Sequence, residues 1–146
     1  MQISVISIKP QYADAIYSGV KLFEFRKKPP TNLRDVYLLY ESAPVSKLTG
    51  AVIFHSSFTV RAEAMVSYIM RLMRVGKSDA VRLMGISEKD LISYAGGPDN
   101  FVAALMISHA CRDSRFETCR VRPPQNWGCV RVAGFPFAEF VAKKGD

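Results

Sequence analysis

The stretch GVKLFEFRKK, residues 19–28, places charged side chains between aromatic ones directly after a glycine. If it forms a strand, Phe23 and Phe25 face one way. Glu24 and Arg26 then face the other way, about 7 Å apart. Two interpretations of this spacing are open: a solvated strand with a surface ion pair of little energetic value, or the charged floor of a binding site.

The residues before this stretch predict a strand followed by a short helix. ISVISI (3–8) is rich in β-branched residues and apolar on both faces, which is typical of a strand that is covered on both sides. In QYADAIYSG (11–19), apolar residues recur at the helical period, and Gly19 is placed to adopt a left-handed turn after the helix. We therefore expect a helix that ends near Ser18.

The rest of the chain carries further strand and helix patterns. Strands are predicted at VYLLYE (36–41) and GAVIFHSSFTV (50–60), and FVAALMISHA (101–110) is expected to be a fully buried strand. Between them, residues 61–97 show the apolar stripes of amphipathic helices. The tail offers one or two more strands, interrupted by proline and glycine.

Length and composition predict one domain. With 146 residues, of which 49% are hydrophobic, the chain can form a core of its own. We assign residues 1–146 to a single domain in which residues 61–97 form a helical insertion, and Ser87 and Asp90 resemble a capping box at its last helix. The pattern predicts an α+β fold, a small and mostly antiparallel β-barrel with a flanking helix at 13–18.

Charge and cysteine usage bear on partners and compartment. The net charge of +7 favours polyanionic partners such as nucleic acid. The cysteines, Cys111, Cys119 and Cys129, are odd in number and loosely spaced, which indicates neither a disulfide framework nor a zinc site. His55 and His109 have no metal-ligating residue at a suitable spacing, so we predict no metal.

Several other classes of protein do not fit the sequence. The apolar run FVAALMI (101–107) is far too short to span a membrane, and no basic leader precedes the first strand. Phosphate-binding P-loops, GxSxG elbows and dinucleotide-binding glycine patterns are missing. We therefore expect a cytoplasmic protein without membrane contact and without a cofactor.

The opening of the chain, SIKPQYADAIYSGVKLFEFRKK, resembles the ASCH domains, which are relatives of the PUA-like RNA-binding fold. These domains carry a G-x-K-x-x-E-x-R pattern after the first helix. Its four positions are filled by Gly19, Lys21, Glu24 and Arg26. The resemblance continues in YESAPVSKLTGAVIF and RPPQNWGCV, and it covers nearly the whole chain.

The resemblance implies a PUA-like barrel with a cleft that holds the lysine, the glutamate and the arginine, and a role in binding RNA or a nucleotide. Some relatives are reported as ribonucleases or as amidohydrolases of an acylated cytidine. In the amidohydrolase branch a threonine, the expected nucleophile, stands in the place of Glu24. Because this chain has no hydroxyl there, the same covalent chemistry is not expected.

The late segment RPPQNW (122–127) presents further candidates. Trp127 could stack on a base and Gln125 could read its edge, or the prolines shape a turn and Trp127 belongs to the core. Lys21 and Glu24 are the catalytic candidates. The predicted ligand-binding residues are Lys9, Arg26, Lys27, Lys28, Ser42, Arg122, Gln125 and Trp127.

Three functions compete at this point. The first is a module that binds RNA or a nucleotide through a basic cleft. The second is a metal-independent hydrolase that acts on RNA or a modified nucleoside, with Lys21 and Glu24 in one cleft. The third is a module that binds a protein partner through residues 61–95.

Overall fold

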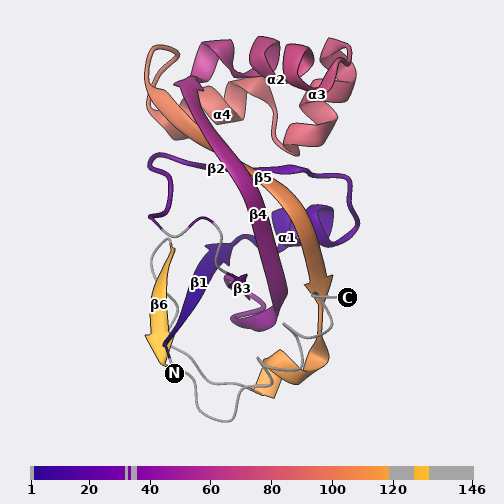
Figure 1. The fold of residues 1–146 in the computed structure, drawn as a ribbon, viewed down its shortest axis with the longest axis vertical. Helices are drawn as coiled ribbons and strands as arrows, with labels where there is room; N and C mark the ends of the chain where they lie inside the picture. Colours follow the sequence, from indigo (N-terminus) through magenta and orange to yellow (C-terminus); the bar gives the residue numbers. More distant parts are fainter. Residues whose placement is uncertain (1, 32, 34–35, 119–126, 132–146) are drawn as a thin grey trace.

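The structure is a computed structural model, in which residues 2–31, 33, 36–118 and 127–131 are described (Figure 1). Its strands are β1 (Gln2–Ile8), β2 (Phe23–Arg26), β3 (Val36–Glu41), β4 (Lys47–Arg61), β5 (Phe101–Arg112) and β6 (Trp127–Arg131). Its α-helices are α1 (Pro10–Tyr17), α2 (Met65–Met73), α3 (Lys77–Met84) and α4 (Glu88–Ala95).

The described strands form one sheet in the order β2-β5-β4-β3-β1-β6. Neighbouring strands are antiparallel, except for β1 and β3, which are parallel. The sheet twists and curls around the long strands β4 and β5, which reach from the helical end past the middle of the molecule (Figure 1). The prediction of an α+β fold built on a mostly antiparallel, barrel-like sheet is confirmed.

Helix α1 follows β1 after Lys9 and covers one part of the sheet. Its residues Ala13 and Ile16 are buried in an apolar cluster with residues of β1, β3, β4 and β5. The helix ends at Tyr17 with Ser18 as its C-cap, and Gly19 has a φ of +83°, as predicted. The chain then turns so that the backbone N–H of Lys21 donates to the carbonyl of Ala15, which places Lys21 beside α1.

The helical insertion lies between β4 and β5 and packs at one end of these strands (Figure 1). Its core includes Met65, Ile69, Met84 and Leu91, which share a cluster with Phe23 of β2. As predicted, Ser87 caps α4: its side chain accepts a hydrogen bond from the backbone N–H of Asp90. The helical insertion therefore packs against β2, the strand within the stretch GVKLFEFRKK.

None of the described helices has the length and apolar character needed to cross a membrane.

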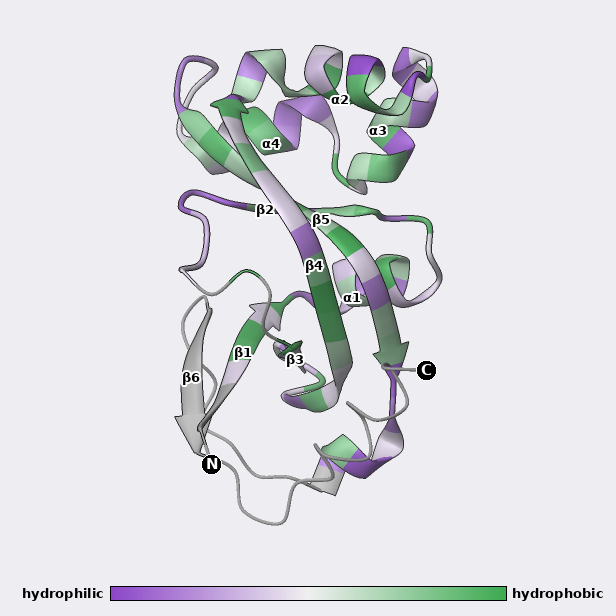
Figure 2. Cartoon of the chain, in the orientation of Figure 1, coloured by the Kyte–Doolittle hydropathy of each residue, from purple (hydrophilic) through white to green (hydrophobic). Residues whose placement is uncertain are grey.

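Strand β5 differs from its prediction as a fully buried strand. Val102 and Ala104 are buried in the core of the helical insertion and Leu105 in the cluster around α1, but Ser108 and His109 are exposed. Farther along, Ile107 and Ala110 pack against the cluster around α1. The second half of β5 is therefore covered on one face only, and the register with β4 is irregular near Phe54. The first half of β4, which is green in Figure 2, supplies much of the apolar surface at this place.

Candidate ligand-binding cleft

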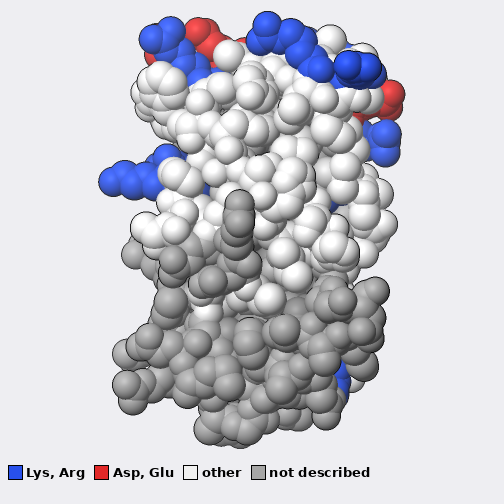
Figure 3. Space-filling model, in the orientation of Figure 1, with Lys and Arg blue, Asp and Glu red and all other residues white. Residues whose placement is uncertain are grey.

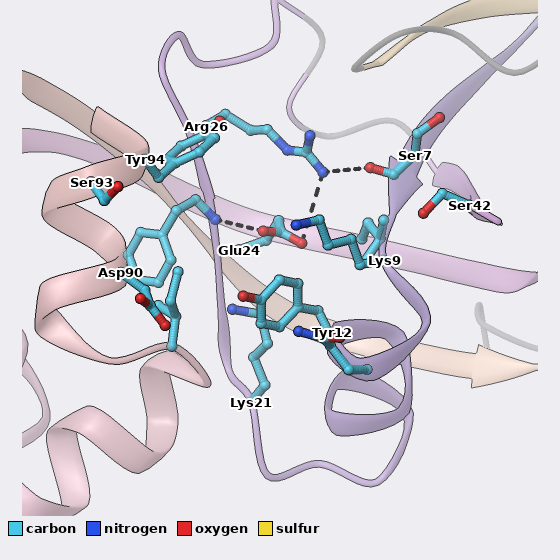
Figure 4. Close-up of a pocket in the computed structure, with 14 residues that line it drawn as sticks. Ser7, Lys9, Tyr12, Lys21, Glu24, Arg26, Ser42, Asp90, Ser93 and Tyr94 are labelled. Atoms are coloured by element: carbon cyan, nitrogen blue, oxygen red, sulfur yellow. Dashed lines mark hydrogen bonds and ion pairs between the residues drawn. The ribbon is translucent and has the colours of Figure 1, made fainter. Parts of the chain in front are cut away.

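A cavity of about 700 Å³ opens between the end of β1, helix α1, strand β2 and helix α4 (Figure 4). This volume lies within the range of about 300–1,000 Å³ that is typical of small-molecule sites. Lys21, Glu24 and Arg26 line the cavity together. The three charged residues of the G-x-K-x-x-E-x-R pattern are thus brought to one place.

The structure excludes the solvated-strand interpretation of GVKLFEFRKK. All four residues of β2 are buried, and the exposed fractions of Glu24 and Arg26 are only 7% and 9%. The reason is that both faces of the strand are covered. Phe23 packs into the core of the helical insertion, and Glu24 and Arg26 face the cavity beside α1 and β1.

Lys21 enters the cavity from the turn between α1 and β2 and is 2% exposed. Its Nζ donates a hydrogen bond of 2.5 Å to the carbonyl oxygen of Met84, the last residue of α3. The same Nζ lies 5.4 Å from the ring centroid of Tyr12 and 5.1 Å from that of Phe25. The amine is therefore held among aromatic rings and one helix carbonyl.

Two opposing effects act on the charge of this lysine. Burial lowers the pKa of the Lys21 amine below its usual range, because the ammonium ion loses hydration. The carboxylate of Glu24 raises the pKa, and the guanidinium of Arg26 lowers it further. Burial is the largest of these causes, so the amine gives up its proton more readily than an exposed lysine does.

Glu24 and Arg26 are held by backbone groups as well as by each other. Glu24 Oε1 accepts a hydrogen bond of 2.8 Å from the backbone N–H of Phe25, and Arg26 Nη2 donates one of 2.8 Å to the carbonyl of Ser7. Arg26 Nη2 lies 3.8 Å from Glu24 Oε2. Within the described residues, Glu24 Oε2 is buried without a hydrogen-bond donor. This oxygen can accept an N–H from a ligand in the cavity.

The other predicted ligand-binding residues do not all lie at the cavity. Lys9 and Ser42 line the cavity, and the backbone N–H of Ser42 donates to the carbonyl of Ile8 beside them. Lys27 and Lys28 are exposed and lie outside the lining. The Nζ of Lys27 stands 5.6 Å from the ring centroid of Tyr94.

The late segment RPPQNW lies only partly within the described residues. Arg122 and Gln125 lie outside the described residues. Trp127 begins β6, where its backbone pairs with Ile6 of β1.

Sequence reasoning missed one wall of the cavity, which is formed by α4. Asp90, Ser93 and Tyr94 project from this helix toward the charged residues of β2 (Figure 4). Partial burial raises the pKa of the Tyr94 hydroxyl above its ordinary value, and the hydroxyl, which is protonated at neutral pH in either case, can donate a hydrogen bond. The sequence predicted the capped helix that carries these residues, but not that the helix lines the cavity. The contact between α4 and β2 depends on how the helical insertion folds back, which no local pattern specifies.

A second polar cluster lies on the other side of α1. Arg112 Nη1 donates to Glu41 at 2.9 Å, and Arg112 Nη2 donates to Asp14 at 2.7 Å. The Arg112 guanidinium stacks 4.4 Å from the ring centroid of Tyr17. Glu41 is buried, and each charge has a partner. We regard this cluster as a structural link between β5, β3 and α1.

The described residues contain no group of three or more His, Cys, Asp or Glu side chains arranged to hold a metal ion. His55 and His109 are exposed on β4 and β5. The Nδ1 of His109 lies 2.9 Å from the hydroxyl of its neighbour Ser108.

The curled sheet, the helical insertion and the charged cleft define a small α+β protein with a polar site at the start of β2. The backbone is similar to that of the ASCH protein from Zymomonas mobilis, with a TM-score of 0.68 and 21% identity over 95% of this chain and 93% of that chain. A serine-to-alanine variant of the same protein matches with a TM-score of 0.68 and 21% identity over 96% and 94% of the two chains. A tyrosine-to-phenylalanine variant matches with a TM-score of 0.68 and 20% identity over 95% and 96%.

The chain therefore has the ASCH fold, as the G-x-K-x-x-E-x-R pattern predicted. At this level of sequence identity the likeness concerns the fold. No family model and no curated protein matches the sequence.

Proposed function

We propose that the protein binds RNA or a free nucleotide in the cleft formed by Lys21, Glu24 and Arg26. The observation that carries this proposal is that these three charged groups are buried together around a cavity large enough for a nucleotide. Burying a charge is costly unless the charge is paired or used, and Glu24 Oε2 has no hydrogen-bond donor among the described residues.

The cavity offers the complementary groups that a nucleotide needs. Lys21 and Arg26 can donate to phosphate or carbonyl oxygens, and Glu24 can accept from a base amino group. Tyr12 and Tyr94 line the cavity from α1 and α4 and can pack against a base. Lys9, which is exposed at the mouth, adds positive charge where a phosphate would enter.

Positive charge outside the cleft supports the choice of a polyanionic ligand. Figure 3 shows exposed Lys and Arg side chains over the helical end of the molecule, with Asp and Glu side chains among them. The net charge of +7 would attract an RNA strand that extends beyond the cleft. Affinity for such a strand should therefore fall steeply as the salt concentration rises.

The proposal is tested by comparing Lys21→Ala with Lys77→Ala. Both changes remove one positive charge, but Lys77 is an exposed residue of α3 outside the cavity lining. We expect Lys21→Ala to reduce the affinity for single-stranded RNA oligonucleotides and nucleoside monophosphates by at least about tenfold, and Lys77→Ala by less than about twofold. Equal affinities for the two variants at several salt concentrations would contradict a site at Lys21.

A second function is favoured by the lowered pKa of Lys21. An amine that releases its proton readily, beside a buried carboxylate, is suited to general acid–base catalysis. The corresponding activity would be metal-independent hydrolysis of RNA or an acylated nucleoside. Product formed by the wild-type protein in the presence of a chelator, and lost in Lys21→Ala, would support the hydrolase over the binding module.

A further inference from the structure

The turn between α3 and α4 meets Lys21 from the side opposite α1. Helix α3 ends at Met84, and Gly85 is its C-cap with a φ of +67°. The last carbonyl groups of a helix have no partner within the helix, and they carry its negative end. One of them, that of Met84, accepts the hydrogen bond from Lys21 Nζ. The side chain of Lys21 thus caps α3 from another part of the chain.

The backbone beside Lys21 is joined to the same turn. The N–H of Leu22 donates to the carbonyl of Leu83 at 2.8 Å, and the carbonyl of Leu22 accepts from Ile107 of β5 at 2.9 Å. Leu22 therefore links the end of α3 to the sheet. This link fixes the distance between the helix terminus and the lysine that precedes Leu22.

Gly85 lies directly against the aliphatic part of Lys21. A Cβ atom on Gly85 would stand 2.6 Å from Cδ, 2.7 Å from Cγ and 3.0 Å from Cβ of Lys21. Contacts this short require the lysine to move. The side chain of Lys21 therefore reaches the Met84 carbonyl by passing over a residue that has no side chain.

We propose that the Met84–Gly85 turn is the element that positions Lys21 in the cleft, and that Gly85 is a positioning residue for whatever ligand Lys21 contacts. The turn supplies the acceptor for Nζ and the free space for the stem. It directs the amine between the rings of Tyr12 and Phe25, toward the cavity. The functional part of this inference rests on the proposed role of Lys21, whereas the positioning itself can be tested without a ligand.

The test compares Gly85→Ala with Gly96→Ala. Gly96 ends α4 with a φ of +87°, so both substitutions impose the same kind of backbone strain. At Gly96, however, the added Cβ meets only the side-chain amide of Asn100, at 3.1 Å. Acetic anhydride labels free amines, and mass spectrometry of the labelled protein between pH 6 and pH 11 gives an apparent pKa for Lys21 in each variant.

We expect Gly85→Ala to move this apparent pKa upward, toward the usual lysine value of 10.5, because the displaced amine becomes hydrated. Gly96→Ala should leave it at the wild-type value. Identical titration of Lys21 in the wild type and in both variants would overturn the inference.

A second measurement covers the case in which Gly85→Ala fails to fold. Lys21→Ala removes Cγ and Cδ, the atoms nearest to the added Cβ, so Gly85→Ala should cost less stability in that background. If Gly85→Ala loses the same stability in both backgrounds, or unfolds in both, backbone strain in the turn alone accounts for the need for glycine at position 85.

Affinity for a labelled RNA oligonucleotide separates this inference from the proposed function. We expect Gly85→Ala to bind about tenfold more weakly than Gly96→Ala. If the titration of Lys21 moves but RNA affinity does not, the positioning role stands and RNA binding at Lys21 is wrong.

Discussion

The ion pair of Glu24 and Arg26 allows a quantitative test of how the cleft is built. Glu24 Oε2 and Arg26 Nη2 are 3.8 Å apart, with side-chain exposures of 9% and 11%. At an effective dielectric constant of about 20, two unit charges at this distance attract by about 4 kcal/mol. Desolvation offsets part of this attraction, so we expect a coupling free energy of about 2–3 kcal/mol.

The perturbation is a double-mutant cycle of Glu24→Gln and Arg26→Gln. Glutamine keeps an acceptor for the N–H of Phe25 and removes only the charge of Glu24. Each single variant should lose about 3 kcal/mol, because it leaves a buried charge without its partner. The double variant should be considerably more stable than the sum of the two losses predicts. Urea unfolding at pH 7 provides the free energies.

The chain offers a matched control at the same distance. Lys77 and Glu88 are also 3.8 Å apart, but their side chains are 70% and 37% exposed. Solvent screens this pair, so the cycle of Lys77→Gln and Glu88→Gln should give less than about 0.5 kcal/mol of coupling. A coupling for Glu24 and Arg26 as small as that of the control would refute the reasoning that burial makes the cleft charges interdependent.

Two further predictions concern Lys21 and Arg112. In the folded chain the pKa of Lys21 is below its unfolded value of 10.5. Between the folded and the unfolded pKa, the unfolded chain binds more protons than the folded chain. The free energy of unfolding of the wild type therefore falls as the pH falls through this window. Lys21→Met has no amine that titrates, so its free energy of unfolding relative to the wild type should increase as the pH is lowered through that window. Parallel pH profiles of the two proteins in urea unfolding would contradict this expectation. Arg112→Met strips the buried Glu41 of its cation and should cost about 2 kcal/mol, less than for a fully buried pair because Arg112 is 45% exposed. Asp14→Asn should cost less than about 0.5 kcal/mol, since Asp14 is 71% exposed; similar losses in thermal or urea unfolding for both variants would count against this assignment.

The parts of the fold that could be predicted are those with a local physical cause. The helix before Gly19 follows from a periodic apolar stripe and a residue that tolerates positive φ. The cap of α4 follows from the hydroxyl of Ser87 three residues before the N–H of Asp90. Both depend on atoms a few residues apart, so the sequence pattern alone determines them.

The errors arise where burial is decided by distant segments. Residues 101–110 are apolar enough for a fully buried strand, yet only the helical insertion and α1 decide which part of β5 is covered. In the same way, the alternation of Phe23 and Glu24 left open whether the charged face of this strand is solvated or covered. Coverage by the insertion on one side and by α1 and β1 on the other buried both faces. Tertiary packing thus overrides the period of the pattern.

The charged residues of the cleft also show that position and charge have separate causes. Each of the three side chains has its own backbone partner: the carbonyl of Met84 for Lys21, the N–H of Phe25 for Glu24 and the carbonyl of Ser7 for Arg26.

This arrangement has a consequence for substitutions in the cleft. Because backbone groups are fixed by the sheet and by α3, neutralising one charged side chain leaves the partners of the other two in place. The charges still interact through space, since Glu24 raises the pKa of Lys21 and lies 3.8 Å from Arg26. Single neutral substitutions should therefore change the electrostatics of the cleft while preserving its shape, which makes a loss of ligand affinity in such variants interpretable as a loss of charge.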